Sequence, residues 1–99
     1  MGQARPPIAL VVEDEIDQAD LVAALLEEAG FETVEAATAD EALACLREKS
    51  SQVALLFTDV RLPHGKDGVD LARIVDRQWP WIKILVTSGV ASERLQHLP

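Results

Sequence analysis

Residues 8–15 read IALVVEDE, a run of five apolar residues that stops abruptly at three acidic ones. A run this short, this apolar and this rich in β-branched residues predicts a strand buried on both faces of a parallel sheet. Two further segments have the same form: VALLF at residues 53–57, followed closely by Asp59, and IKILV at residues 82–86, followed directly by Thr87. The three segments together predict the centre of a parallel sheet.

Segments with helical spacing separate these runs. In residues 16–29, apolar side chains three and four residues apart form one helical face, which we expect to pack inward through Leu21, Ala24, Leu25 and Ala29. Residues 31–36 alternate weakly and predict an exposed, edge-like strand. Thr38 and Glu41 form a capping box that opens a helix. Residues 69–79 predict a third helix.

Strands and helices thus alternate along the chain, which predicts an α/β fold with a doubly wound parallel sheet and helices on both faces. We expect one domain over residues 8–99, preceded by a disordered lead at residues 1–7, with the start of a further helix at residues 91–98. In such sheets the functional crevice lies beyond the carboxyl ends of the strands.

Composition excludes several classes of protein. The 99 residues are 48% apolar and 26% charged, which excludes a disordered chain. The net charge of −8 argues against a nucleic-acid partner or a polybasic membrane patch, and no apolar run reaches the roughly 18 residues that span a bilayer. The single cysteine, Cys45, excludes an internal disulfide and fits a reducing compartment, so we expect a cytoplasmic protein.

Polar residues follow three of the expected strands: Glu13 and Asp14, then Asp59, then Thr87. Parallel strands bring these ends to one edge, where a divalent cation would relieve the repulsion among the carboxylates. Oxygen ligands without nearby His or Cys favour Mg²⁺. A carboxylate beside such a metal can also act as a nucleophile and form an aspartyl phosphate. The alternative is an acidic turn that is merely solvated.

Four motifs in this order and spacing resemble the receiver domain of bacterial two-component response regulators. They are VVEDE at 11–15, FTDVRLP at 57–63, DG at 67–68 and LVTSG at 85–89. The resemblance covers about residues 8–91 and implies a flavodoxin-like fold with strand order 2-1-3-4.

The resemblance also implies a role for each matching residue. Asp59 would be the phosphoacceptor, taking a phosphoryl group from a histidine kinase or a histidine phosphotransfer protein. Asp14 would be a direct Mg²⁺ ligand, Glu13 its partner acting through water, and the Arg61 carbonyl a backbone ligand of the metal. Thr87 would be the switch hydroxyl. Such a domain is a phosphoacceptor in signal transduction and not an enzyme in the usual sense.

Receivers also have a fifth strand, ending in a lysine that pairs with the acceptor, and a fifth helix. These 99 residues end at Pro99, before that strand, and Lys66 is the loop lysine nearest to the expected site. One alternative is therefore a pseudo-receiver that binds proteins without phospho-switching. Another is a Mg²⁺-dependent phosphohydrolase, although enzymes of that type normally have Asp where this chain has Arg61. An unpaired fourth strand further predicts self-association, through that strand or by exchange of the C-terminal segment.

Overall fold

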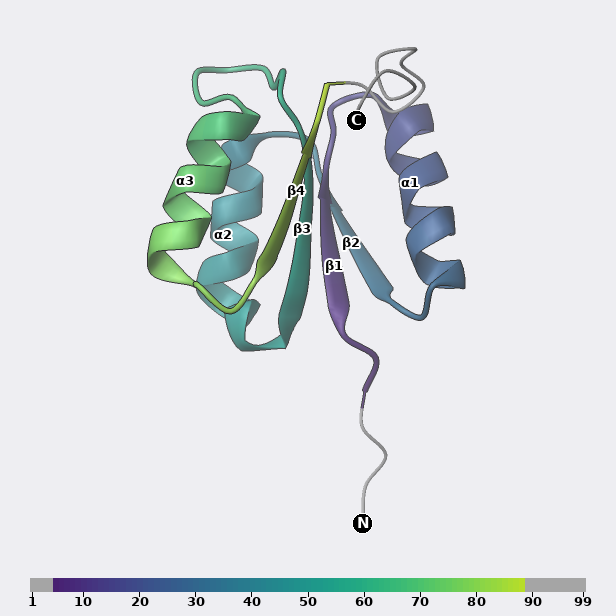
Figure 1. Cartoon of the computed structure of the whole chain (residues 1–99). Helices are drawn as coiled ribbons and strands as arrows, with labels where there is room; N and C mark the ends of the chain where they lie inside the picture. The colour runs from purple at the N-terminus through teal and green to yellow at the C-terminus, as the bar shows by residue number, and fades with distance from the viewer. Residues whose placement is uncertain (1–4, 89–99) are drawn as a thin grey trace, which may run out of the picture.

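The computed structural model describes residues 5–88, so the lead residues 1–4 and the helix expected at 91–98 lie outside the described part of the chain. Strands and helices alternate as the sequence predicts (Figure 1). The elements are β1 (Ile8–Val12), α1 (Ile16–Glu28), β2 (Glu32–Ala36), α2 (Ala39–Lys49), a 3-10 turn at Ser50–Gln52, β3 (Val53–Asp59), α3 (Gly68–Gln78) and β4 (Lys83–Thr87).

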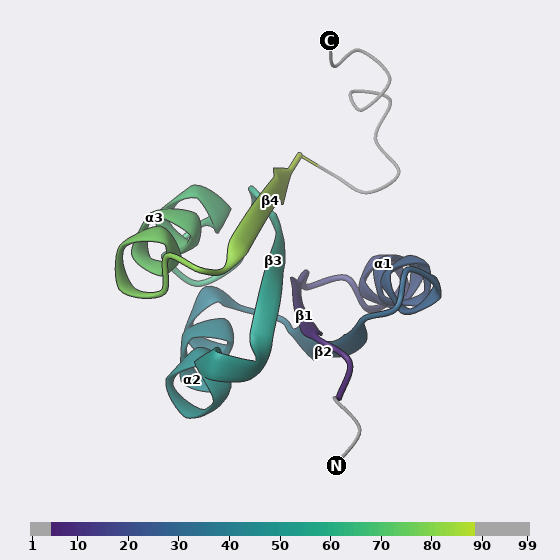
Figure 2. The same ribbon diagram turned by 60° about the horizontal axis from the view of Figure 1, so that its bottom comes forward.

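The strands form one four-stranded parallel sheet in the order β2-β1-β3-β4. Helix α1 covers one face of the sheet, and α2 and α3 cover the other (Figures 1 and 2). This arrangement confirms the predicted doubly wound α/β fold. It also gathers the carboxyl ends of the parallel strands at one edge of the molecule.

The larger core lies between the sheet and the helices α2 and α3. Its fully buried side chains include Leu10, Leu46, Leu56, Leu71 and Val75, each with no exposed surface. Burial of this many aliphatic side chains is the main favourable contribution to folding. The central strands β1 and β3 are therefore held rigidly, and so are the residues that follow them.

The predicted inward face of α1 is wrong. Leu21 and Leu25 are 50% and 58% exposed, and Ala24 and Ala29 are exposed as well. The buried side chains are instead Ala19, Val22 and Ala23, which lie with Val11 and Phe57 in a smaller second core. The reason is that residues 21–26 are all apolar, so spacing alone could not select the inward face; the small residues allow α1 to approach the sheet closely.

Side-chain caps fix the start of α2 and of α3. Thr38 Oγ1 accepts a hydrogen bond from the Glu41 N–H at 3.1 Å, and Glu41 reaches back to the N–H of Ala37 at 2.9 Å. Asp67 and Asp70 form a reciprocal capping box at the start of α3. Caps of this kind satisfy backbone donors that a helix leaves free.

The first described residues have no helix or strand, but they contact the sheet. The carbonyl of Pro7 accepts a hydrogen bond from the Glu32 N–H at 2.9 Å, and Arg5 lies 3.5 Å from the Glu32 carboxylate. Cys45 is a free thiol that packs against the larger core, and burial raises its pKa. No helix within residues 5–88 is long and apolar enough to cross a membrane.

Candidate functional site

Three predicted site residues meet at the carboxyl edge of the sheet. Glu13 directly follows β1, Asp59 is the last residue of β3, and Thr87 is the last residue of β4. Asp59 and Thr87 are register partners, and the N–H of Val60 donates to the Thr87 carbonyl at 2.7 Å. The convergence predicted from the strand ends is therefore present in the structure.

Glu13 is a buried carboxylate, with 5% of its surface exposed. Its Oε2 accepts a hydrogen bond from the Glu15 N–H at 3.0 Å, while its buried Oε1 has no hydrogen-bond partner. Burial raises the pKa of Glu13 to about 7. The Glu15 bond opposes this rise, and the nearby carboxylates of Asp59 and Asp14 add to it. The site thus concentrates negative charge where solvation is poor.

Asp59 is half-buried and held by its own neighbours. Its Oδ1 accepts a hydrogen bond from the Arg61 N–H at 3.1 Å. The fully buried Thr58 donates its hydroxyl to the Asp59 carbonyl at 2.9 Å, which fixes the backbone at the end of the strand. The Asp59 carboxylate also lies close enough to Glu13 to raise the pKa of that buried side chain.

Gly68, the first residue of α3, packs directly against the backbone at the end of β3. Its N–H donates to the Val60 carbonyl at 2.7 Å. A Cβ atom at Gly68 would overlap the Asp59 carbonyl oxygen and lie 2.9 Å from the Cα of Val60. Only glycine fits there without a shift of the backbone. The spacing of apolar residues does not predict this close contact. The one sign of it in the sequence is that a glycine directly follows Asp67.

The remaining predicted residues surround this centre. Asp14 is exposed and lines a hollow of about 480 Å³ with the first residues of α1. Arg61 is exposed, and its backbone turns toward Asp59 through the N–H already described. Thr87 is buried, with 6% of its surface exposed. The candidate site therefore has a buried floor and an open, acidic rim.

The donor set fits a hard divalent cation in its chemistry. Carboxylate oxygens converge, and one of them, Glu13 Oε1, is buried without a partner. Yet no group of three or more His, Cys, Asp and Glu side chains in the described range 5–88 has the arrangement of a ready-made metal centre. Glu13 and Asp59 alone would therefore not complete the coordination shell of a cation, which would also need Asp14 or water.

Among the hydrogen bonds and ion pairs of residues 5–88, none joins Lys66 or Lys83 to Asp59. Lys66 Nζ contacts Asp40 Oδ1 at 3.2 Å, which ties the loop before α3 to the start of α2. Lys83 begins β4, at the end of that strand opposite to Thr87. Lys66 is therefore engaged elsewhere in this structure.

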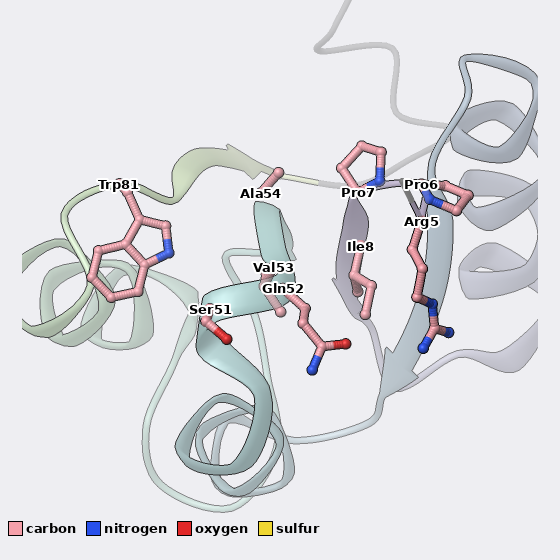
Figure 3. A pocket seen from close by; sticks show the side chains of 9 residues that line it. All are labelled: Arg5, Pro6, Pro7, Ile8, Ser51, Gln52, Val53, Ala54 and Trp81. Carbon is pink, nitrogen blue, oxygen red and sulfur yellow. The ribbon is translucent and has the colours of Figure 1, made fainter. Parts of the chain in front are cut away.

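A second hollow lies at the opposite end of the sheet. It has a volume of about 630 Å³ and lies between residues 5–8, residues 51–54 and Trp81 (Figure 3). Trp81 is anchored there because its indole N–H donates to the Ser50 carbonyl at 3.2 Å. None of the predicted site residues lines this hollow.

The chain is similar to known signalling proteins over most of its length. The family described as "Response regulator receiver domain" matches residues 9–97. The nitrogen assimilation regulatory protein NtrX of Azorhizobium caulinodans is 36% identical over 81 residues, which are 81% of this chain and 17% of that protein. The transcriptional regulatory protein AruR of Pseudomonas aeruginosa is 41% identical over 73 residues, 71% of this chain and 30% of that protein. This chain therefore spans less than a third of the length of these relatives.

Solved structures agree with the sequence matches. The receiver domain of NtrX from Brucella abortus is 38% identical, with a TM-score of 0.69, and the match covers 79% of this chain and 64% of that one. A response regulator receiver domain from Clostridium thermocellum is 25% identical, with a TM-score of 0.75, covering 81% of this chain and 63% of that one. With the match at residues 9–97, the chain belongs to the response regulator receiver domain family.

Proposed function

We propose that this domain accepts a phosphoryl group on Asp59 from a phosphohistidine of a histidine kinase or a phosphotransfer protein, in a Mg²⁺-dependent reaction. The observation that carries the proposal is the pairing of Asp59 with Thr87, beside the buried carboxylate of Glu13. An acceptor needs an open oxygen, a hydroxyl that can reach the transferred group and a site for a counter-ion. Asp59, Thr87 and Glu13 follow or end neighbouring strands at one sheet edge, which supports the proposal.

In the proposed step, Asp59 Oδ2 attacks phosphorus. A P–O bond to Asp59 forms as the P–N bond to the donor imidazole breaks, and the bonding electrons leave on the imidazole nitrogen, which takes up a proton. The Arg61 N–H holds Oδ1 at 3.1 Å and so orients the carboxylate for attack. Thr87 then supplies a hydroxyl for a phosphoryl oxygen.

Glu13, Asp14, Asp59 and the Arg61 carbonyl would hold the Mg²⁺. When bound, the ion would neutralise charge that develops on the phosphoryl oxygens. The carboxylates of these residues lie close together and repel one another, and a bound cation would offset this repulsion. The ionised form of Glu13 would gain most from the cation, because this carboxylate is buried and one of its oxygens has no hydrogen-bond partner.

The test is the intact mass of the chain after incubation with acetyl phosphate and Mg²⁺. We expect the gain of one phosphoryl group, which is lost on treatment with hydroxylamine. Asp59→Asn should show no gain, whereas Asp76→Asn, an exposed carboxylate on α3, should behave as the parent. Labelling that is unaffected by Asp59→Asn would refute the assignment of the acceptor.

One observation favours a second candidate, a pseudo-receiver that binds partner proteins without switching. The lysines among residues 5–88 are Lys49, Lys66 and Lys83. Lys66 pairs with Asp40, and Lys83 begins β4 at the end opposite to Thr87. In a protein where no lysine pairs with the phosphoryl group, we expect phosphorylation to have little effect on the fold. If the chain gains no mass with either acetyl phosphate or a phosphohistidine donor, this result would support the second function.

A further inference from the structure

The peptide group that joins Asp59 to Val60 is held at both of its ends. Its carbonyl oxygen accepts a hydrogen bond from the Thr58 hydroxyl at 2.9 Å. Its N–H, which belongs to Val60, donates to the Thr87 carbonyl at 2.7 Å. A peptide group is planar, so bonds at its two opposite ends fix its orientation. The backbone directly after the proposed acceptor is therefore held in one direction.

The next peptide group, which joins Val60 to Arg61, is held in the same way. The Val60 carbonyl accepts from the Gly68 N–H at 2.7 Å, and the Arg61 N–H donates to Asp59 Oδ1 at 3.1 Å. Of the four partners of these two peptide groups, two are backbone groups and one is the carboxylate of the acceptor itself. The Thr58 hydroxyl is the fourth, and a single substitution can remove it without changing Asp59.

Packing alone does not require a hydroxyl at position 58. Thr58 is fully buried, and in the register of the sheet it lies between Val12 on β1 and Val86 on β4. A valine has nearly the same shape as a threonine and would fit between these neighbours. Burial of a hydroxyl is unfavourable unless it finds a hydrogen-bond partner, and the Asp59 carbonyl is that partner. The hydroxyl therefore serves the backbone of Asp59.

We infer that Thr58 is a positioning residue for phosphoryl transfer, because its hydroxyl fixes the peptide group after Asp59 and so directs the Asp59 carboxylate. The inference rests on the proposed function, since it assigns one more residue to the same reaction. Thr58 has no exposed surface, so it cannot touch a phosphoryl donor and acts only through Asp59.

Loss of the hydroxyl should loosen the two peptide groups together. The first group would keep its bond to Thr87 but could turn about it, and the Arg61 N–H that holds Asp59 Oδ1 follows directly in the chain. Displacement of a reacting group from its productive geometry slows the chemical step. We therefore expect the rate constant of phosphoryl transfer to fall and the apparent affinity for the donor to stay nearly the same.

The test is the rate of phosphoryl incorporation by the 99-residue chain at increasing acetyl phosphate concentration and saturating Mg²⁺. Thr58→Val removes the hydroxyl and should lower the maximal rate constant about tenfold, while the half-saturating concentration stays within about twofold. Thr58→Ser keeps the hydroxyl and should retain most of the parent's rate. Val53→Ala is the matched control, because it leaves a cavity at a buried position of the same strand, at the end away from Asp59. It should lower the stability without slowing the transfer.

Amide hydrogen exchange gives a second readout that needs no phosphoryl transfer. The Val60 N–H should exchange faster in Thr58→Val than in the parent, and at nearly the parent's rate in Thr58→Ser. The N–H of Leu10, in the centre of β1, should keep its exchange rate in both variants.

A Thr58→Val variant that matches the parent in transfer rate or in Val60 exchange overturns the inference. So does an equal loss of rate in Thr58→Ser or in Val53→Ala, because packing or stability would then account for the effect. A rise in exchange that includes Leu10 equally overturns it, since the whole fold would then be loosened. A parent chain that takes up no phosphoryl group refutes the proposed function, and the role of Thr58 with it. Equal uptake by the parent and Thr58→Val refutes the role of Thr58 alone.

Discussion

Gly68 and Asp59 are in such close contact that the first turn of α3 cannot carry a side chain at this point. A Cβ atom at Gly68 would overlap the Asp59 carbonyl oxygen and lie 2.8 Å from its carbonyl carbon. The contact joins the start of a helix to the end of the strand that presents the acceptor. The position of Asp59 therefore depends on a residue that carries no chemistry of its own.

Gly68→Ala should consequently destabilise the domain and displace Asp59. The methyl group meets backbone atoms that cannot rotate away, so we expect a loss of about 1–3 kcal/mol in the free energy of unfolding. Urea denaturation measures this loss. Val69→Ala is the control, since Val69 is the next residue and is 37% exposed. Equal stability of the Gly68→Ala variant and the parent would show that the strand end is free to move.

The stability of the metal-free domain should depend on the charge of Glu13. Its pKa is raised to about 7, so the folded state binds this proton more tightly than the unfolded state. The stabilisation is fully present below the ordinary pKa of about 4.5 and is lost as the pH rises through about 7. Glu13→Gln should therefore stabilise the fold at pH 8, by at most about 3 kcal/mol, and have little effect at pH 5.

Urea denaturation of the parent and of Glu13→Gln at the two pH values, in the presence of a chelator, measures this difference. The gain at pH 8 should shrink when Mg²⁺ is added, because the cation stabilises the ionised carboxylate of the parent. Glu28→Gln, an exposed residue of α1, is the control and should show no such dependence. A gain at pH 5 as large as that at pH 8 would contradict the assignment of the burial effect to Glu13.

Much of the site could be predicted from the sequence because strand direction alone brings it together. Short apolar runs identify the central strands, and the residues after them must meet once the strands are parallel. Asp59 and Thr87 are register partners for this reason. The predicted cap at Thr38 is also confirmed, and it was predictable because its partner Glu41 is close in sequence.

Other features depend on packing between distant residues and leave no periodic signal. The apolar residues of α1 point in all directions, so the inward position of Val22 and the exposure of Leu25 are decided by the sheet. The unpartnered Oε1 of Glu13 is likewise a result of its burial in the folded chain. The approach of Gly68 to Asp59 needs the path of the whole loop between them.

Lys66 should contribute little to stability. Its ion pair with Asp40 joins two exposed side chains, 47% and 74% accessible, so we expect Lys66→Gln to change the free energy of unfolding by less than about 0.5 kcal/mol. We also expect the rate of phosphoryl incorporation from acetyl phosphate to stay the same. A much shorter lifetime of the aspartyl phosphate in this variant would show that Lys66 leaves Asp40 once Asp59 is phosphorylated.

Asp14 should be the residue that completes the cation site. Glu13 is buried and Asp59 half-buried, whereas Asp14 is exposed, and the described residues have no ready-made cluster of three ligands. Asp14→Asn removes one negative charge and a strong oxygen donor, so Mg²⁺ affinity should fall by about tenfold or more, given that even outer-shell changes cost that much. Asp76→Asn on α3 removes an equal charge away from the site and should leave the affinity within about twofold of the parent, since exposed charges are screened.

Tryptophan fluorescence is a poor reporter of this binding, because Trp79 and Trp81 lie just before β4, at the end opposite to Thr87. Amide shifts of residues 13–15 and 59–61 during a Mg²⁺ titration measure the binding directly. If Asp14→Asn and Asp76→Asn lower the affinity equally, the ion responds to net charge, and Asp14 is not a ligand.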